Sequence, residues 1–285
     1  MSVPVVSVSP VEMGERSVRV SAPVSGSGLP VLLFSHGFGS SSRAYGPLVD
    51  HWAGHGFVVV QPTHLDSRTL GLPDDDPRRR TFWRHRVDDM TRVLDGLDVV
   101  EAAVPGLAGR VDRDRVVAAG HSFGGQTVGV LLGLRVEGED LADPRVTAGV
   151  LLATAGRGGD DLRPGVIEMF PWLDPDFSAM KAPALVVMGD ADASALSTRG
   201  PDWSADPYRL SPPGKSLLTL VGAEHSLGGI PGYEAAETTD EDPARVAALQ
   251  RLTTAYLRSA LDPADAAWSE AAATVPAAIG RVESR

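Results

Sequence analysis

The chain has 285 residues, of which 43% are apolar and 22% charged, enough to bury the core of one large α/β domain. Its net charge of −11 argues against binding to a phosphate backbone, and the basic run at residues 78–80 follows an acidic run at residues 74–76, so no nucleic-acid partner is expected. The absence of cysteine excludes disulfides, thiolate chemistry and zinc bound by cysteine.

Short apolar runs rich in β-branched residues alternate along the chain with segments of helical periodicity. The predicted strands are, in chain order, residues 17–22, 31–35, 57–61, 116–120, 149–154, 184–189 and 216–221. Several are apolar on both faces, which is typical of parallel strands covered on both sides. The predicted helices are residues 45–55, 80–103, the run that begins after residue 122, and 244–260. This alternation predicts a mostly parallel, doubly wound α/β sheet flanked by helices.

We expect a single domain over residues 1–262, followed by a C-terminal tail or terminal helix over residues 263–285. Two irregular stretches, residues 156–178 and 193–214, interrupt the alternation. Both follow the carboxyl ends of predicted strands, where sheets of this kind bind ligands, so they are predicted to be short cap-like insertions over a pocket. The alternative is that they are long surface loops.

The N-terminus has no basic start before a long apolar core, and no later apolar run approaches the length of a membrane span. We therefore expect a cytoplasmic protein without stable membrane insertion. The sequence does not indicate an oligomeric state.

A tight turn, Gly120-His121-Ser122-Phe123-Gly124, directly follows the apolar run at residues 116–119. In a G-x-S-x-G turn the serine lies at a strained corner between a strand and a helix, and the flanking glycines remove side chains that would collide there. Small residues compatible with a helix follow the turn. The pattern predicts that Ser122 is a nucleophile.

A serine hydroxyl becomes a good nucleophile when a base takes its proton and an acid orients that base. His225 is the candidate base, because it follows the last predicted strand within a flexible loop. Asp192 is the candidate acid, because it lies between the two in sequence, just past the run at residues 184–189. The alternative acids are Asp190, Asp160 and Asp161.

The tetrahedral oxyanion of such a reaction needs two backbone N–H donors. Phe123, the residue after the nucleophile, is expected to supply one. The strand predicted over residues 31–35 leads into a Gly-rich turn, in which Phe38 is expected to supply the other. Both phenylalanines are also expected to line the pocket. Further aromatic candidates for the pocket are Trp83, Phe170, Trp172 and Trp203.

His64, Asp66 and Arg68 follow another predicted strand and can approach the same edge of the sheet, although a local ion pair or turn explains them more simply. The histidines show no metal-ligand spacing with nearby carboxylates. We therefore expect no catalytic metal and no cofactor.

With these residues the chain resembles α/β-hydrolases from about residue 31 to residue 225, in the order nucleophile, acid, histidine. Residues 33–39, 55–59 and 120–125 resemble more narrowly the platelet-activating factor acetylhydrolase, chlorophyllase and dienelactone-hydrolase-like group of serine esterases. The resemblance implies ester hydrolysis without a cofactor. It also implies the nucleophile at Ser122, the base at His225 and the oxyanion amides at Phe38 and Phe123.

Two departures limit this resemblance. Acetylhydrolases of the group carry their acid just after the strand that follows the nucleophile helix, but residues 152–155 contain no carboxylate. Asp192 follows the next strand instead, which is similar to most α/β-hydrolases, cutinase-like polyester hydrolases included, so a phospholipid substrate is not implied. Dienelactone hydrolases use a cysteine nucleophile, which this chain lacks.

The sequence therefore predicts a serine hydrolase that cleaves a small carboxylic ester or lactone with an apolar portion, through an acyl-enzyme intermediate. One alternative keeps the triad but is a thioesterase or acyltransferase of a biosynthetic pathway. The other is a non-catalytic binding protein, which usually lacks the nucleophile, the base or an oxyanion glycine, and none of these is lost here.

Overall fold

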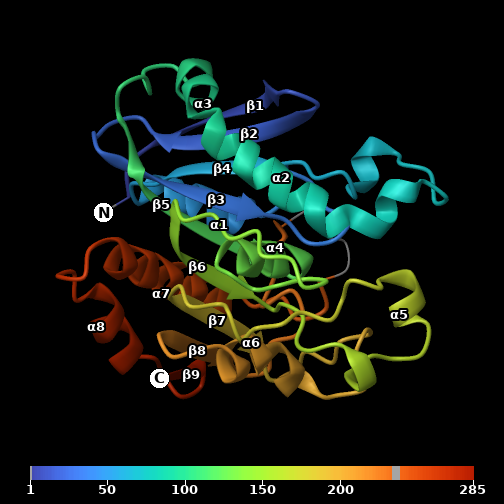
Figure 1. Ribbon diagram of the computed structural model, residues 1–285. Coiled ribbons are helices and arrows are strands. Elements are labelled where there is room, and N and C mark those ends of the chain that lie inside the picture. Colours follow the sequence, from blue (N-terminus) through green and yellow to red (C-terminus); the bar gives the residue numbers. More distant parts are fainter. Residues whose placement is uncertain (1, 233–237) are drawn as a thin grey trace.

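Unbroken apolar runs form the centre of the sheet in the computed structural model, which describes residues 2–232 and 238–285. Within these residues one sheet has nine strands in the order β1-β2-β4-β3-β5-β6-β7-β8-β9 (Figure 1). The strands between β4 and β8 pair in parallel, whereas β1, β2 and β9 pair antiparallel at the two edges. The strands are β1 (Val5–Met13), β2 (Arg16–Pro23), β3 (Leu29–Ser35), β4 (Val58–Pro62), β5 (Val111–His121), β6 (Val146–Leu152), β7 (Ala184–Gly189), β8 (Lys215–Leu220) and β9 (Gly280–Ser284).

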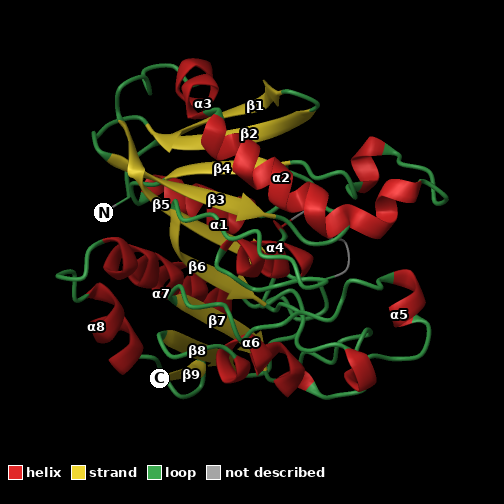
Figure 2. Ribbon diagram, viewed as in Figure 1, coloured by secondary structure: helices red, strands yellow, loops and turns green. Residues whose placement is uncertain are grey.

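Helices cover both faces of the sheet (Figure 2). Leu32 and Phe34 of β3 pack in one apolar cluster with α1, α7 and α8, while Val31 and Leu33 pack in another with α2, α3 and α4. This alternation follows from the two-residue period of a strand. The helices are α1 (Gly46–Gly54), α2 (Phe82–Asp95), α3 (Leu97–Ala103), α4 (Phe123–Leu131), α5 (Val166–Met169), α6 (Asp206–Leu210), α7 (Pro243–Leu261) and α8 (Ala267–Ala273).

The predicted mostly parallel sheet flanked by helices is confirmed. The prediction of one helix over residues 80–103 is wrong, because α2 ends and α3 begins at Gly96. A Cβ atom at Gly96 would lie 2.5 Å from Met13 Cε, so the glycine lets β1 approach the break closely.

The two edge strands β1 and β9 were not predicted. Ser7, Ser9 and Pro10 interrupt the apolar residues of β1, and β9 contains a single large apolar residue, Val282. Both strands form by pairing with a stronger neighbour. The segment at residues 263–285, expected as a tail or terminal helix, thus contains both α8 and a strand of the sheet.

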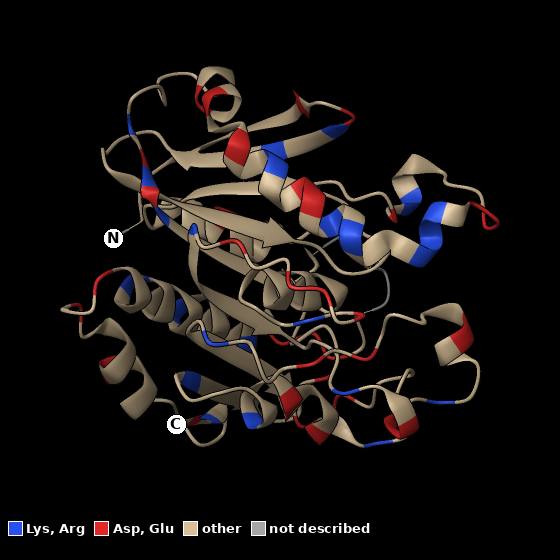
Figure 3. Ribbon diagram, viewed as in Figure 1, with Lys and Arg blue, Asp and Glu red and all other residues tan. Residues whose placement is uncertain are grey.

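Charged residues occur mainly on the helices and loops around the sheet (Figure 3). The basic run at residues 78–80 does not form an isolated basic patch, because Arg78 pairs with Asp76 and Arg79 with Asp74. None of the helices in the described part of the chain is both long and apolar enough to cross a membrane.

Candidate active site

Ser122 lies at a strained corner between β5 and α4. Its φ of 56° and ψ of −120° are rarely adopted by residues other than glycine. A Cβ atom at Gly120 would lie 2.2 Å from the Gly124 carbonyl oxygen, and one at Gly124 would lie 1.9 Å from the Ser35 carbonyl oxygen. Both contacts are with backbone, which cannot swing aside. The two glycines are therefore required for the turn that raises the Ser122 hydroxyl at the carboxyl end of the sheet.

Asp192 and His225 meet across the loops that follow β7 and β8. His225 Nδ1 lies 3.0 Å from Asp192 Oδ2. The Asp192 side chain is 3% exposed and that of His225 is 50% exposed, so a buried carboxylate holds an imidazole that solvent and ligands can reach. The parallel strands place both loops at the edge of the sheet where Ser122 lies.

The alternative acids have other surroundings. Asp190 Oδ1 accepts a hydrogen bond from the Gly222 N–H at 2.6 Å, and Asp161 pairs with Arg199 at 3.1 Å. Asp160 is exposed. Of the four aspartates considered, Asp192 is the one whose carboxylate contacts the imidazole of His225.

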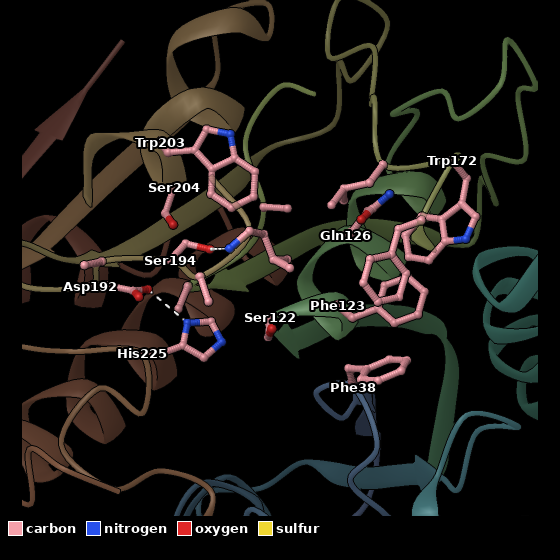
Figure 4. A pocket seen from close by; sticks show the side chains of 17 residues that line it. Phe38, Ser122, Phe123, Gln126, Trp172, Asp192, Ser194, Trp203, Ser204 and His225 are labelled. Carbon is pink, nitrogen blue, oxygen red and sulfur yellow. Dashed lines mark hydrogen bonds and ion pairs between the residues drawn. The ribbon is translucent and has the colours of Figure 1, made fainter. Parts of the chain in front are cut away.

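Ser122 and His225 line the same cavity (Figure 4). Among the described residues, no hydrogen bond joins the side chains of Ser122 and His225. The hydrogen bond that Figure 4 marks at the His225 imidazole is the one to Asp192. A loose contact between nucleophile and base is common in structures without substrate and tightens when substrate binds. The arrangement brings together all three residues that the sequence nominated, from three different loops.

The two expected oxyanion donors border this cavity as well. Phe38 follows β3, and Phe123 is the first residue of α4. Within residues 2–232 and 238–285 neither backbone N–H has a hydrogen-bond partner in the protein. Both rings line the cavity, with their centroids 6.3 Å apart. The amides are thus available to a bound carbonyl oxygen.

A buried ion pair fixes the loop that carries Phe38. The fully buried side chain of Arg86 on α2 donates two hydrogen bonds to Asp66, at 2.8 and 2.7 Å. Arg86 also donates to the His36 carbonyl oxygen at 2.6 Å, and Asp66 accepts from the Gly39 N–H at 3.0 Å. The pair therefore holds the backbone on both sides of Phe38.

The ionisation of Asp66 follows from the same contacts. Burial by itself raises the pKa of this carboxyl, but the charge and hydrogen bonds of Arg86 outweigh burial and hold the pKa well below its usual value. A local ion pair or turn was the simpler expectation for Asp66, and its partner Arg86 is not apparent from the sequence. The available signal was an arginine on the apolar side of the helix, between Phe82 and Met90.

His121, which lies between Gly120 and Ser122, connects the loop of His225 with the turn that carries Phe38. Its Nε2 donates to the His225 carbonyl oxygen at 2.8 Å. Its Nδ1 then accepts from the Tyr45 hydroxyl at 2.9 Å, and the same hydroxyl accepts from the Gly37 N–H at 3.0 Å. Burial, together with the nearby His225, lowers the pKa of His121 to about 3, so the ring is neutral and keeps this tautomer. Neither His121 nor Tyr45 was among the site residues expected from the sequence.

The cavity has a volume of about 350 Å³ and is lined mainly by apolar side chains. Both irregular stretches contribute to it: residues 156–178 supply Phe170, Trp172 and Leu173, and residues 193–214 supply Ser194, Leu196 and Trp203. The Trp172 ring stacks on Phe123 with centroids 4.5 Å apart. Trp83 is a correction to the expected pocket, because it lies on α2 with its ring buried in the core, and its Nε1 donates to Glu137.

Three further candidates also lie outside the cavity lining. His64 and Asp66 are buried below the Phe38 turn, and Arg68 follows them in a short 3₁₀ helix. In the part of the chain that the structure describes, no group of three or more acidic or histidine side chains is arranged to hold a metal ion.

A nine-stranded, mostly parallel sheet with a serine on a tight turn after β5, and with later loops that supply an aspartate and a histidine, defines a class of protein. The chain belongs to the α/β-hydrolase superfamily.

Residues 2–142 match the family described as Chlorophyllase. The chain is 35% identical over 148 residues to a putative non-heme haloperoxidase of Mycobacterium phage D29, covering 50% of this chain and 42% of that protein. It is 28% identical over 141 residues to the platelet-activating factor acetylhydrolase of Bos taurus, covering 36% of this chain and 32% of the relative. It is 26% identical over 200 residues to Cutinase 2 of Thermobifida cellulosilytica, covering 69% and 60%.

The chain thus spans less than two thirds of the length of each of these curated relatives. The resemblance to chlorophyllases and acetylhydrolases seen in the sequence is confirmed by these matches. The Chlorophyllase match lies in the N-terminal half, which contains the Phe38 turn and the Ser122 turn.

Proposed function

We propose that the chain is a serine hydrolase that cleaves a carboxylic ester or lactone through an acyl-enzyme intermediate. The observation that carries the proposal is the buried Asp192 carboxylate bound to the His225 imidazole in the same cavity as Ser122. Relatives named as cutinase and acetylhydrolase support ester bonds over other acyl bonds.

Each residue has a defined step in this proposal. His225 Nε2 takes the proton of Ser122 Oγ as that oxygen attacks the ester carbonyl, and Asp192 holds the Nδ1–H and stabilises the imidazolium. The N–H groups of Phe38 and Phe123 donate to the oxyanion of the tetrahedral intermediate. His225 then gives the proton to the leaving alcohol. Water, activated by the same histidine, releases the acid from Ser122.

The cavity favours substrates with an apolar part. Phe170, Trp172 and Trp203 form walls on which an acyl or alcohol group can be buried, and a volume of about 350 Å³ suits a small molecule. We therefore propose a small ester with an apolar portion as the substrate class.

Hydrolysis of p-nitrophenyl esters of increasing acyl length tests the proposal. We expect Ser122→Ala to lower kcat by about a thousandfold or more, and Ser269→Ala, on the exposed side of α8, to leave it unchanged. A fluorophosphonate probe should label Ser122, as peptide mass spectrometry would show. Equal ester turnover by the Ser122→Ala variant and the unmodified chain would contradict the proposal.

Parallel assays with acyl thioesters, and with alcohols as acceptors, distinguish an esterase from a thioesterase or acyltransferase.

A further inference from the structure

The wall of the cavity contains a buried polar side chain with no partner. Gln126 is 2% exposed, and both Oε1 and Nε2 of its amide are out of contact with solvent and without a hydrogen bond among the described residues. An amide left in this state carries a free-energy penalty, because it has lost its bonds to water and gained none in return. Buried polar groups without partners are rare and need a specific explanation.

The position of Gln126 ties it to the chemistry at Ser122. It lies in the first turn of α4, and its backbone N–H donates to the carbonyl oxygen of Ser122, the residue just before the helix, at 3.3 Å. Both residues line the cavity. Figure 4 shows the Gln126 amide between Trp172 and Trp203 in this view, with the Ser122 hydroxyl below it. A ligand bound at Ser122 and extending into the cavity therefore passes beside Gln126.

The surroundings of Gln126 indicate which kind of group it binds. The ionisable residues among the described lining are Asp192 and His225, and these two are bonded to each other. A charged substituent would have no counter-ion against the aromatic walls and would lose its hydration there. A neutral group that accepts from the amide N–H, donates to its C=O, or does both loses little free energy on leaving water, because the amide replaces its hydrogen bonds to water.

We propose that Gln126 binds a neutral hydrogen-bonding group of the substrate, such as a carboxamide, hydroxyl or ketone, a few bonds away from the ester. This inference rests on the proposed ester hydrolysis and makes the substrate class narrower: an ester whose buried part is apolar except at one point. Trp172 Nε1 is also buried without a partner, but Figure 4 shows it on the side of the ring that faces away from Gln126, so it offers no second contact there.

Matched pairs of esters test the inference. One series has p-nitrophenyl esters with a terminal carboxamide at increasing distance from the ester, and the other has acetate esters of alcohols with the same carboxamides. Each compound is paired with an isostere in which an isopropyl group replaces the carboxamide. We measure the ratio of kcat/KM within each pair for the unmodified chain, for Gln126→Met, and for Gln250→Met as a control on α7, outside the cavity.

We expect that at one or more lengths the carboxamide-to-isopropyl ratio falls by about two- to tenfold in Gln126→Met, as the loss of one neutral hydrogen bond implies, and stays unchanged in Gln250→Met. Since methionine is similar in size and apolar, the variant should cleave the isopropyl esters at least as well as the unmodified chain. An equal ratio in the two proteins at every length, with the isopropyl esters still cleaved, would overturn the inference and leave the proposed esterase activity standing.

A binding measurement separates the two proposals if no ester is cleaved. Calorimetric titration of Ser122→Ala, with and without Gln126→Met, uses the methyl esters that correspond to the first series. A Kd for the carboxamide that is about two- to tenfold weaker in the double variant, and unchanged for the isopropyl isostere, supports the Gln126 contact independently of catalysis. Equal Kd values in both variants contradict it.

Discussion

The guanidinium carbon of Arg86 lies 4.2 Å from the centre of the Phe123 ring. The same side chain donates to the His36 carbonyl oxygen and is paired with Asp66, which holds the Gly39 N–H. One buried cation thus contacts the helix end that carries the Phe123 amide and the turn that carries the Phe38 amide. Because the proposed oxyanion hole would depend on preorganised donors, we infer that the Arg86–Asp66 pair fixes the distance between the two amides.

Arg86→Met is therefore expected to lower the proposed kcat by tenfold or more with a small change in KM, because the two amides act mainly in the transition state. It should also reduce the free energy of unfolding by about 3–5 kcal/mol, since Asp66 is left buried without its partner. Ester kinetics and urea unfolding measure the two effects.

The double variant Arg86→Met/Asp66→Asn separates the effects of charge and position. It should recover part of the lost stability, because no unpaired buried charge remains, while kcat stays low. Arg84→Met, on the same helix but exposed, is the control. Full recovery of kcat in the double variant would show that the Arg86–Asp66 pair does not position the donors.

The contrast between Ser122 and Arg86 explains how much of the site could be predicted. Ser122, Phe123 and the strand and helix around them are encoded within a dozen neighbouring residues, so local turn chemistry reveals them. Asp192 and His225 were found because parallel strands end at one edge of the sheet, although sequence alone left Asp190 and other acids open. Arg86 acts through residues about 20 and 50 positions earlier in the chain, and no local pattern reports such a contact.

The elements of the fold also differ in how far their own sequences predict them. Central strands are predictable because both of their faces are buried, which leaves continuous apolar runs. The edge strands β1 and β9 are held by pairing with a neighbour, and their own sequences are mixed. At the break, Gly96 lies against the side chain of Met13, more than eighty residues earlier, and periodicity along a helix cannot reveal such a contact.

Tyr45→Phe tests the connection between His121 and the Phe38 turn. The variant removes the hydroxyl that donates to His121 Nδ1 and accepts from the Gly37 N–H, leaving two buried polar atoms without partners. We expect a loss of about 1–3 kcal/mol in the free energy of unfolding and a lower kcat, because the His225 loop is no longer tied to the turn. Tyr208→Phe, on α6 outside the cavity, is the control. Unchanged stability and kcat in Tyr45→Phe would show that the bonds carry no net energy.

The stability of the protein should fall on acidification because of its buried neutral histidines. Burial lowers the pKa values of His36 and His64 well below the ordinary 6.5 and that of His121 to about 3. Between about pH 6.5 and these folded-state values the unfolded chain binds the extra protons, so stability is present above pH 6.5 and is lost as the pH falls. Each such histidine contributes about 1.4 kcal/mol per pH unit to the slope.

His121→Gln should reduce that slope by about 1.4 kcal/mol per pH unit between pH 6 and pH 4, since glutamine can still donate to the His225 carbonyl and accept from Tyr45 but does not titrate. Urea unfolding at a series of pH values measures the slope. A slope equal to that of the unmodified chain would mean that His121 already binds its proton in the folded state.

Gly124→Ala tests whether the turn that carries Ser122 has room for a side chain at position 124. The added Cβ would lie 1.9 Å from the carbonyl oxygen of Ser35, and since that atom belongs to the backbone of β3, either α4 or the strand must move. We expect a loss of at least about 3 kcal/mol in the free energy of unfolding and of most of the proposed activity. The shift would move the Phe123 amide relative to the Phe38 amide, the other proposed oxyanion donor. Gly46→Ala, at the start of α1, meets no atom closer than 3.7 Å and should leave both quantities nearly unchanged. Thermal unfolding and ester kinetics of the two variants measure these effects. Full activity in Gly124→Ala would show that the turn tolerates a side chain at this position and that glycine is not required there.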